Sequence, residues 1–262
     1  MQLHTSVKRI DAVGVVSFDN PPTGIITNKG AAHLSDAIET LFGDSSVRAL
    51  VITGAAPGVF IRHADVAQIV RAGEALTAGR IGVEDFLTSP FSRLTRLCDA
   101  APIPVIAAID GVCMGGGFEI ALACTFRIAG STVERIGLPE IRLGIFPGGG
   151  GIQRLGRLIG IHRARAFILR GAVIGAEQAL SMGLIDEVAP SAYGRAMELA
   201  NELAGRSPVA VRAIMELTHI NDYEAGLREE ALRFTALLKE HPETLARLRM
   251  FVAGGEDLGG IP

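Results

Sequence analysis

The sequence predicts an α/β fold in which strands alternate with helices to about residue 190, followed by a helical region over residues 191–262. Two continuous apolar runs, Ala49–Thr53 and Pro104–Ile109, are typical of strands buried on both faces of a sheet. Other stretches repeat apolar residues every three or four positions, which indicates amphipathic helices. We therefore expect a parallel or mixed sheet with both faces covered.

The individual elements follow in chain order. Strands are expected at 3–18 (a hairpin that breaks at Asp11), 49–53, 104–109, 125–129 and 134–137. Helices are expected at 31–42, at about 63–71, and at 83–97, 118–124, 152–159, 163–169, 176–182, 193–203, 210–217, 223–238 and 242–252. Residues 72–82 are rich in Gly and Ala and are expected to form a loop.

The composition is that of a globular protein, with 48% hydrophobic and 20% charged residues among 262. A net charge of −3 offers no electrostatic argument for a nucleic-acid partner. The most apolar stretch, residues 100–114, is interrupted by prolines and is shorter than the roughly 20 residues of a membrane span, and the N-terminus lacks a signal-peptide core. We expect a cytoplasmic protein without a membrane partner. The three cysteines lack CxxC spacing and are expected to be free, buried thiols that hold no metal: Cys98, Cys113 and Cys124.

A glycine run at residues 115–117 is the first candidate for chemistry. The segment Asp110–Glu119 ends a buried strand, passes through the glycines and opens a helix. Free N–H groups at a helix start hold anions, including an oxygen that gains charge during a reaction. The alternative is a glycine-rich packing turn, with Glu119 stabilising the helix start.

A glutamate in an apolar setting is the second candidate. Glu140 lies among Leu138, Ile141 and Leu143, and loss of water would raise its pKa toward values useful for general acid catalysis. The alternative is a surface glutamate paired with a nearby arginine, Arg135 or Arg142.

The third candidate is the segment Gly58–Asp65, which follows a buried strand and precedes a helix. Asp65 is placed to cap that helix. His63 is a candidate general base or ligand, although isolated histidines are more often structural. Signatures of P-loop, Rossmann, serine-hydrolase and zinc-protease sites (GxxxxGK[ST], GxGxxG, GxSxG and HExxH) are absent from the sequence.

Together the three segments resemble the enoyl-CoA hydratase/isomerase (crotonase) family. Members of that family have, in order, F-x-x-G-A-D, P-V-I-A with a following G-G-G-x-E, and P-E with a following P-G-x-G-G-x-Q-R-L. The corresponding stretches here are Phe60–Asp65, Pro104–Glu119 and Pro139–Leu155. Their order and spacing agree over about residues 10–190, which makes the resemblance more specific than any one glycine run.

The resemblance implies a crotonase-like spiral of ββα units (residues 1–190) and a helical C-terminal region (residues 191–262) for trimerisation and pocket closure, in a homotrimer or hexamer. It implies an acyl-CoA substrate whose coenzyme A is part of the substrate, with no separate cofactor and no metal. The backbone amides of Ala64 and Gly116 would bind the thioester oxygen, and Glu119 and Glu140 would add water to a 2-enoyl-CoA. The remaining residues that would contact substrate or water are Thr23, Gly24, Ile25, Arg62, His63, Asp65, Gly115, Pro139 and Gly148.

Departures from the family pattern keep other reactions open. His63 stands where the family usually has Gly, Gly24 stands where Asn is common, and no Lys follows Asp65. The leading interpretation is an enoyl-CoA hydratase. The alternatives are an enoyl-CoA isomerase, an acyl-CoA thioester hydrolase and a non-catalytic acyl-CoA-binding protein.

Overall fold

The computed structural model describes residues 4–218 and, beyond them, residues 232, 236, 240, 241 and 244. The chain divides into two compact units, residues 1–205 and 206–262. The boundary predicted at residue 190 falls inside the first unit, just before helix α9 (Ala192–Ala204). The first unit contains both sheets and the elements that form the candidate site.

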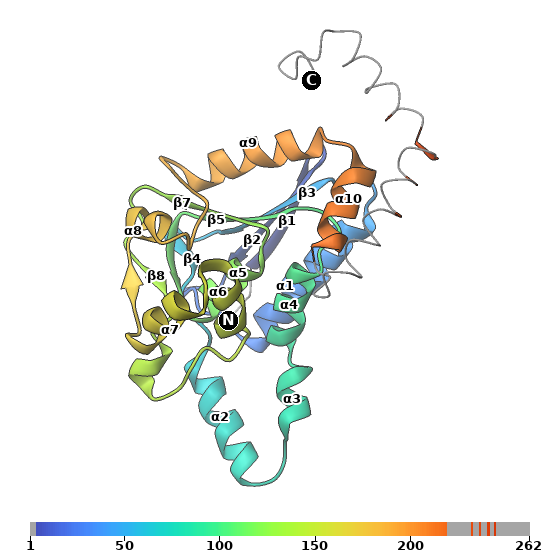
Figure 1. Cartoon of the computed structure of the whole chain (residues 1–262). Coiled ribbons are helices and arrows are strands. Elements are labelled where there is room, and N and C mark those ends of the chain that lie inside the picture. The colour runs from blue at the N-terminus through green and yellow to red at the C-terminus, as the bar shows by residue number, and fades with distance from the viewer. Residues whose placement is uncertain (1–3, 219–231, 233–235, 237–239, 242–243, 245–262) are drawn as a thin grey trace. The chain divides into compact units, whose positions relative to one another are not determined.

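The larger sheet has six strands in the order β1-β2-β3-β5-β7-β10 (Figure 1). Its strands are β1 (His4–Ile10), β2 (Val13–Asp19), β3 (Ala49–Gly54), β5 (Val105–Ile109), β7 (Phe126–Gly130) and β10 (Glu187–Ala189). β1 and β2 form the expected antiparallel hairpin, with Asp11 at φ 52° in its turn, and the remaining pairs are parallel. The predicted α/β class with a mixed sheet is confirmed.

A second sheet has four strands, which alternate along the chain with strands of the first sheet. Its strands, in spatial order, are β4 (Gly58–Ile61), β6 (Gly111–Met114), β8 (Ile136–Gly137) and β9 (Val173–Ile174). Three times the chain passes from a strand of the first sheet to a strand of the second, from β3 to β4, from β5 to β6 and from β7 to β8. Each time it then enters a helix. At one crossing a Cβ on Gly111 would overlap the backbone of Gly58, which explains the glycine there. These repeats are the predicted ββα units.

Helices connect the strands. They are α1 (Asn28–Gly43), α2 (Val66–Thr77), α3 (Val83–Leu87), α4 (Pro90–Asp99), α5 (Gly116–Ala123), the 3-10 helix η1 (Glu140–Leu143), α6 (Gly151–Ile159), α7 (Ile161–Leu169), α8 (Ala176–Ser181), α9 and, in the second unit, α10 (Pro208–Leu217). No described helix is long and apolar enough to cross a membrane. The helices predicted at 223–238 and 242–252 lie almost entirely outside the described residues.

The boundaries of one predicted helix and of one predicted loop were wrong. The helix expected at 83–97 is two helices, because Ser89 caps a new helix whose first residue is Pro90, and proline lacks the N–H that a continuous helix needs. The loop expected at 72–82 is partly helical, since α2 continues to Thr77 through residues with high helix propensity. α2 and α3 project away from the sheets (Figure 1), and neither contains a buried residue.

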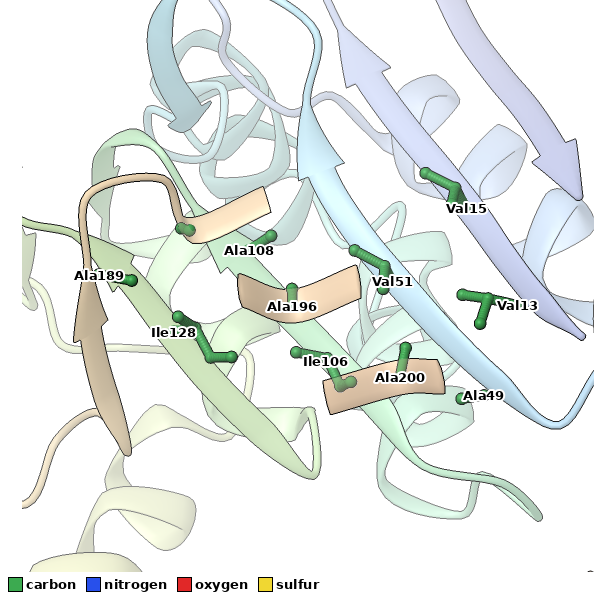
Figure 2. Packing of buried hydrophobic residues seen from close by; sticks show 11 residues of the cluster. Val13, Val15, Ala49, Val51, Ile106, Ala108, Ile128, Ala189, Ala196 and Ala200 are labelled. Carbon is green, nitrogen blue, oxygen red and sulfur yellow. The ribbon is translucent and has the colours of Figure 1, made fainter. Parts of the chain in front are cut away.

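Both faces of the central strands are buried. Figure 2 shows α9 lying across one face, with Ala196 and Ala200 against residues such as Val51 and Ile106. Alanine at every fourth position lets this helix approach the sheet closely. On the opposite face, a Cβ on Gly14 would lie 2.9 Å from a methyl group of Leu41 in α1. The fully buried strand predicted at 49–53 is thereby confirmed.

Candidate active site

A free backbone amide follows strand β4. In the parallel bridge between Ile26 and Ala64, the Ile26 amide donates to the His63 carbonyl (2.9 Å) and the Asp65 amide donates to the Ile26 carbonyl (2.8 Å). These two bonds use the neighbours of Ala64, so its own N–H is directed away from Ile26. That N–H donates to none of the described residues. Asp65 caps α2 as predicted, accepting from the Ala67 amide at 2.9 Å.

A second free amide begins helix α5. Gly115 has φ 49° and donates its N–H to the Gly137 carbonyl at 2.9 Å, which leaves Gly116 as the first residue of the helix. Within the described part of the chain, the Gly116 N–H also has no acceptor. A Cβ on Gly116 would lie 3.1 Å from the Ala64 nitrogen. The two amides are therefore neighbours, and glycine keeps the space in front of them open.

Glu119 lies one turn into α5 and is only 4% exposed. Its Oε1 accepts two hydrogen bonds, from the amides of Gly149 (2.8 Å) and Gly151 (2.9 Å). Burial raises the pKa of this carboxyl, and the two amide bonds and the positive charge of Arg154 oppose that effect. The carboxylate is thus held in one orientation by groups that favour its ionised form.

Glu140 is the first residue of η1 and is half-buried. Its Oε2 is buried and accepts or donates no hydrogen bond among the described residues. Burial raises the pKa of Glu140 to about 7; its own amide lowers the value and the negative charge of Glu119 raises it. The predicted desolvation of this glutamate is confirmed, and no ion pair joins it to Arg135 or Arg142 in the described structure.

The glycine turn brings Glu140 and His63 to one place. A Cβ on Gly115 would lie 3.0 Å from Oε1 of Glu140 and 3.6 Å from Cβ of His63. The His63 Nδ1 lies 2.8 Å from the Ala64 carbonyl oxygen. Because a carbonyl only accepts hydrogen bonds, Nδ1 is assigned a proton.

The predicted segment Thr23–Ile25 lies beside the Ala64 segment. Gly24 has φ 64° in a turn, and its carbonyl accepts from the Arg62 amide at 2.9 Å. The side chain of Asn20 holds the end of this turn by donating to the Ile25 carbonyl at 2.8 Å. The residues predicted to line the coenzyme A pocket are therefore brought together.

Several residues of the site were not predicted from the sequence. Gly148 was singled out in the glycine tract, but Gly149 and Gly151 are the residues that bind Glu119. The ring of Phe91 in α4 lies next to the tract, and its Cζ would be 3.2 Å from a Cβ on Gly116. No local pattern identifies Phe91, because its position depends on how α4 packs against α5. The predicted residue Pro139 directly precedes η1.

Among the described residues, no three side chains of His, Cys, Asp or Glu lie close enough together to hold a metal ion.

The arrangement combines two unpaired amides with two carboxyl groups in different environments. Neighbouring amides of this kind can bind an oxygen that gains negative charge. One carboxyl is bound by amides, and the other has a pKa near neutrality. Such a pair is suited to moving protons to and from a substrate held at the amides.

Comparisons with known proteins show the family to which the chain belongs. The sequence model of the enoyl-CoA hydratase/isomerase family matches residues 8–246, so the chain belongs to that family. An enoyl-CoA hydratase structure from Bacillus anthracis is 30% identical, with 95% of this chain and 96% of that chain covered and a TM-score of 0.83. Pseudomonas aeruginosa DspI is 32% identical over 90% of this chain and 96% of that chain, with a TM-score of 0.80. The enoyl-CoA hydratase of Thermoplasma volcanium is 25% identical over 94% of this chain and 96% of that chain, with a TM-score of 0.83.

Proposed function

We propose that this protein is an enoyl-CoA hydratase, a lyase that adds water across the α,β double bond of a 2-enoyl-CoA thioester. The observation that supports this reaction is the pair Glu119 and Glu140 beside the free amides of Ala64 and Gly116. Hydration needs a base for water and an acid for the α-carbon, and the two carboxyl groups have the environments that these roles require.

In the proposed reaction, the thioester oxygen accepts hydrogen bonds from the Ala64 and Gly116 amides. Glu119 orients a water molecule and takes its proton while the water oxygen bonds to the β-carbon. The electron pair of the double bond moves toward the thioester oxygen, where the amides stabilise it. Glu140 supplies a proton to the α-carbon, and the proton on Glu119 is returned to Glu140, so one water is consumed and both carboxyl groups are restored.

The proposal extends to the substrate contacts and the assembly. Thr23, Gly24, Ile25 and the Arg62–Asp65 segment would contact the coenzyme A part of the substrate, Pro139 would also contact the substrate, and the Gly148 backbone would hold the attacking water. No separate cofactor or metal is needed, because coenzyme A is part of the substrate. We also propose a cytoplasmic homotrimer or hexamer, in which residues 191–262 contribute to assembly and pocket closure.

The direct test is the loss of absorbance of the conjugated enoyl thioester with purified full-length protein and a panel of acyl chain lengths. Hydration removes the conjugation and yields a 3-hydroxyacyl-CoA, which mass spectrometry identifies by the mass of one added water. Absence of turnover on every chain length would refute the hydratase proposal.

His63 supports a second candidate reaction. Its imidazole, on the residue that precedes Ala64 and bonded through Nδ1 to the Ala64 carbonyl, is an additional base that hydration does not require. Double-bond isomerisation would add no mass, and thioester hydrolysis would release free coenzyme A, so the products separate these reactions from hydration. A binding protein without activity would instead be stabilised against heat by acyl-CoA and give no product.

A further inference from the structure

A partly buried arginine, Arg154, connects helix α6 to the end of helix α4. The Arg154 side chain is 13% exposed, and its Nε donates to both carboxylate oxygens of Asp99, at 2.9 and 3.0 Å. A second nitrogen, Nη1, donates to the carbonyl oxygen of Gly149 at 2.6 Å. Such a planar, multiply bonded arrangement is specific to arginine.

The same glycine tract binds Glu119. The Gly149 amide donates to Oε1 of Glu119, and the Gly149 carbonyl accepts from the guanidinium of Arg154. The next peptide group is bound through the backbone of residue 154 and not through its side chain: the Gly150 carbonyl accepts from the Arg154 amide (3.0 Å), as in any α-helix, and the Gly151 amide donates to Glu119 (2.9 Å). Arg154 therefore bonds to both peptide groups that flank Gly150.

The tract depends on such outside contacts because it has no side chains of its own. Four consecutive glycines, Gly148–Gly151, have more backbone freedom than any other sequence. Gly150 has φ 97°, and a Cβ on it would overlap the guanidinium of Arg154. Glycine is thus required for the arginine to reach the backbone, and the arginine restricts the freedom that glycine introduces.

We propose that Arg154, oriented by Asp99, is a positioning residue that holds the glycine tract so that two amides bind one oxygen of Glu119. This leaves the other carboxylate oxygen to orient the attacking water. The catalytic part of this inference rests on the proposed hydratase function; the positioning of Glu119 does not. The charged groups that act on Glu119 are Arg154 from α6 and, from η1, Glu140.

The test compares Arg154→Met with a matched control, Arg127→Met. Arg127 has the same bonding pattern, because it donates to both oxygens of Asp186 and to the Cys124 carbonyl (2.8 Å), but it does not contact the glycine tract. Titration of the Glu119 carboxyl by carbon-13 NMR in the full chain, assigned with Glu119→Gln, is the readout that needs no turnover. We expect the midpoint in Arg154→Met to rise by about half a pH unit or more, because a positive charge is lost and the amides of Gly149 and Gly151 are no longer held toward Glu119, while Arg127→Met titrates like the parent.

Kinetics provide a second readout. Arg154→Met and Asp99→Asn should lower kcat about tenfold with KM nearly unchanged, since the substrate contacts remain. If Arg154→Met does not fold, Arg154→Lys keeps the charge without the planar fork and should show a smaller loss of kcat in the same direction.

Three results would overturn the inference: an unshifted Glu119 midpoint in Arg154→Met, an equal shift in Arg127→Met, or parental kcat in both Arg154 variants. A shifted midpoint in a protein whose parent hydrates no enoyl-CoA would support the positioning role and refute the proposed function alone.

Discussion

The two carboxyl groups of the site, Glu119 and Glu140, differ in the helix that carries them, in burial and in hydrogen bonding. Glu119 lies in the first turn of an α-helix, is buried, and receives two amide hydrogen bonds on one oxygen. Glu140 lies in a 3-10 turn, is half-buried, and has an oxygen without a partner among the described residues. Burial raises the pKa of both carboxyls; at Glu119 two amide hydrogen bonds and Arg154 oppose that effect, whereas Glu140 retains its proton to about pH 7. The backbone around each side chain, more than the side chain itself, determines the role.

The most severe test of this difference is Glu140→Gln. The amide preserves size but has no acidic proton, so kcat for hydration should fall by about 100-fold or more, in the range observed for lost general acids. Steady-state kinetics on the best enoyl-CoA substrate measures this, with the exposed Glu134→Gln as control. Parental activity in Glu140→Gln would remove Glu140 from the mechanism.

The amides of Ala64 and Gly116 are tested by Gly116→Ala. The added methyl would lie 3.0 Å from Cβ of Ala64 and 3.1 Å from its nitrogen, and would block the approach of a thioester oxygen. We expect a loss in kcat of up to about 100-fold, similar to the removal of one oxyanion donor. Gly156→Ala, where nothing lies within 4 Å, is the control in a helix and should keep full activity. Equal kinetics for the two variants would contradict the proposed oxygen site.

The pH dependence sharpens the comparison. If Glu140 acts as the acid, kcat/KM should fall as pH rises through about 7, because the carboxyl loses its proton there. The same raised pKa affects the free energy of unfolding. Because the pKa of Glu140 is higher in the folded protein than its ordinary value, protonated Glu140 contributes to stability at low pH, and this contribution is lost as the pH rises through about 7.

Denaturant unfolding should therefore show Glu140→Gln to be more stable than the parent at pH 8, by about 1 kcal/mol after allowance for solvent screening of a half-buried group. No difference should appear at pH 4, where the carboxyl is protonated. A parent whose kcat/KM and stability are flat between pH 6 and 8 would exclude the pKa near 7.

The smallest effect is expected for His63→Gly. The imidazole bonds to the Ala64 carbonyl through Nδ1, whereas the proposed hydration would use the Ala64 amide. Hydration should change by less than about threefold, in line with a substitution outside the reacting groups. Product analysis by mass spectrometry accompanies the rates. A large loss of activity or a change of product would favour isomerisation or thioester hydrolysis and give His63 a direct role.

Local patterns predicted a good part of the molecule. The buried strands at 49–53 and 104–109, the cap at Asp65 and the helix after the glycine run depend on short-range periodicity and turn chemistry, and all are confirmed. The division of one predicted helix at Pro90 follows from a local rule that the apolar spacing obscured.

The sequence by itself determined which residues are able to act: the glycines at a helix start, a glutamate one turn later, and a second glutamate in an apolar segment. Only the tertiary structure decided which of them meet. The Ala64 amide comes within 3.1 Å of the Cβ position of Gly116 because β4 pairs with β6 in the second sheet. Glu119 is bound by Gly149 and Gly151, and these by Arg154, because α6 packs against α5 and Asp99 ends α4. Contacts between distant segments depend on strand order and helix packing, and no local spacing specifies them.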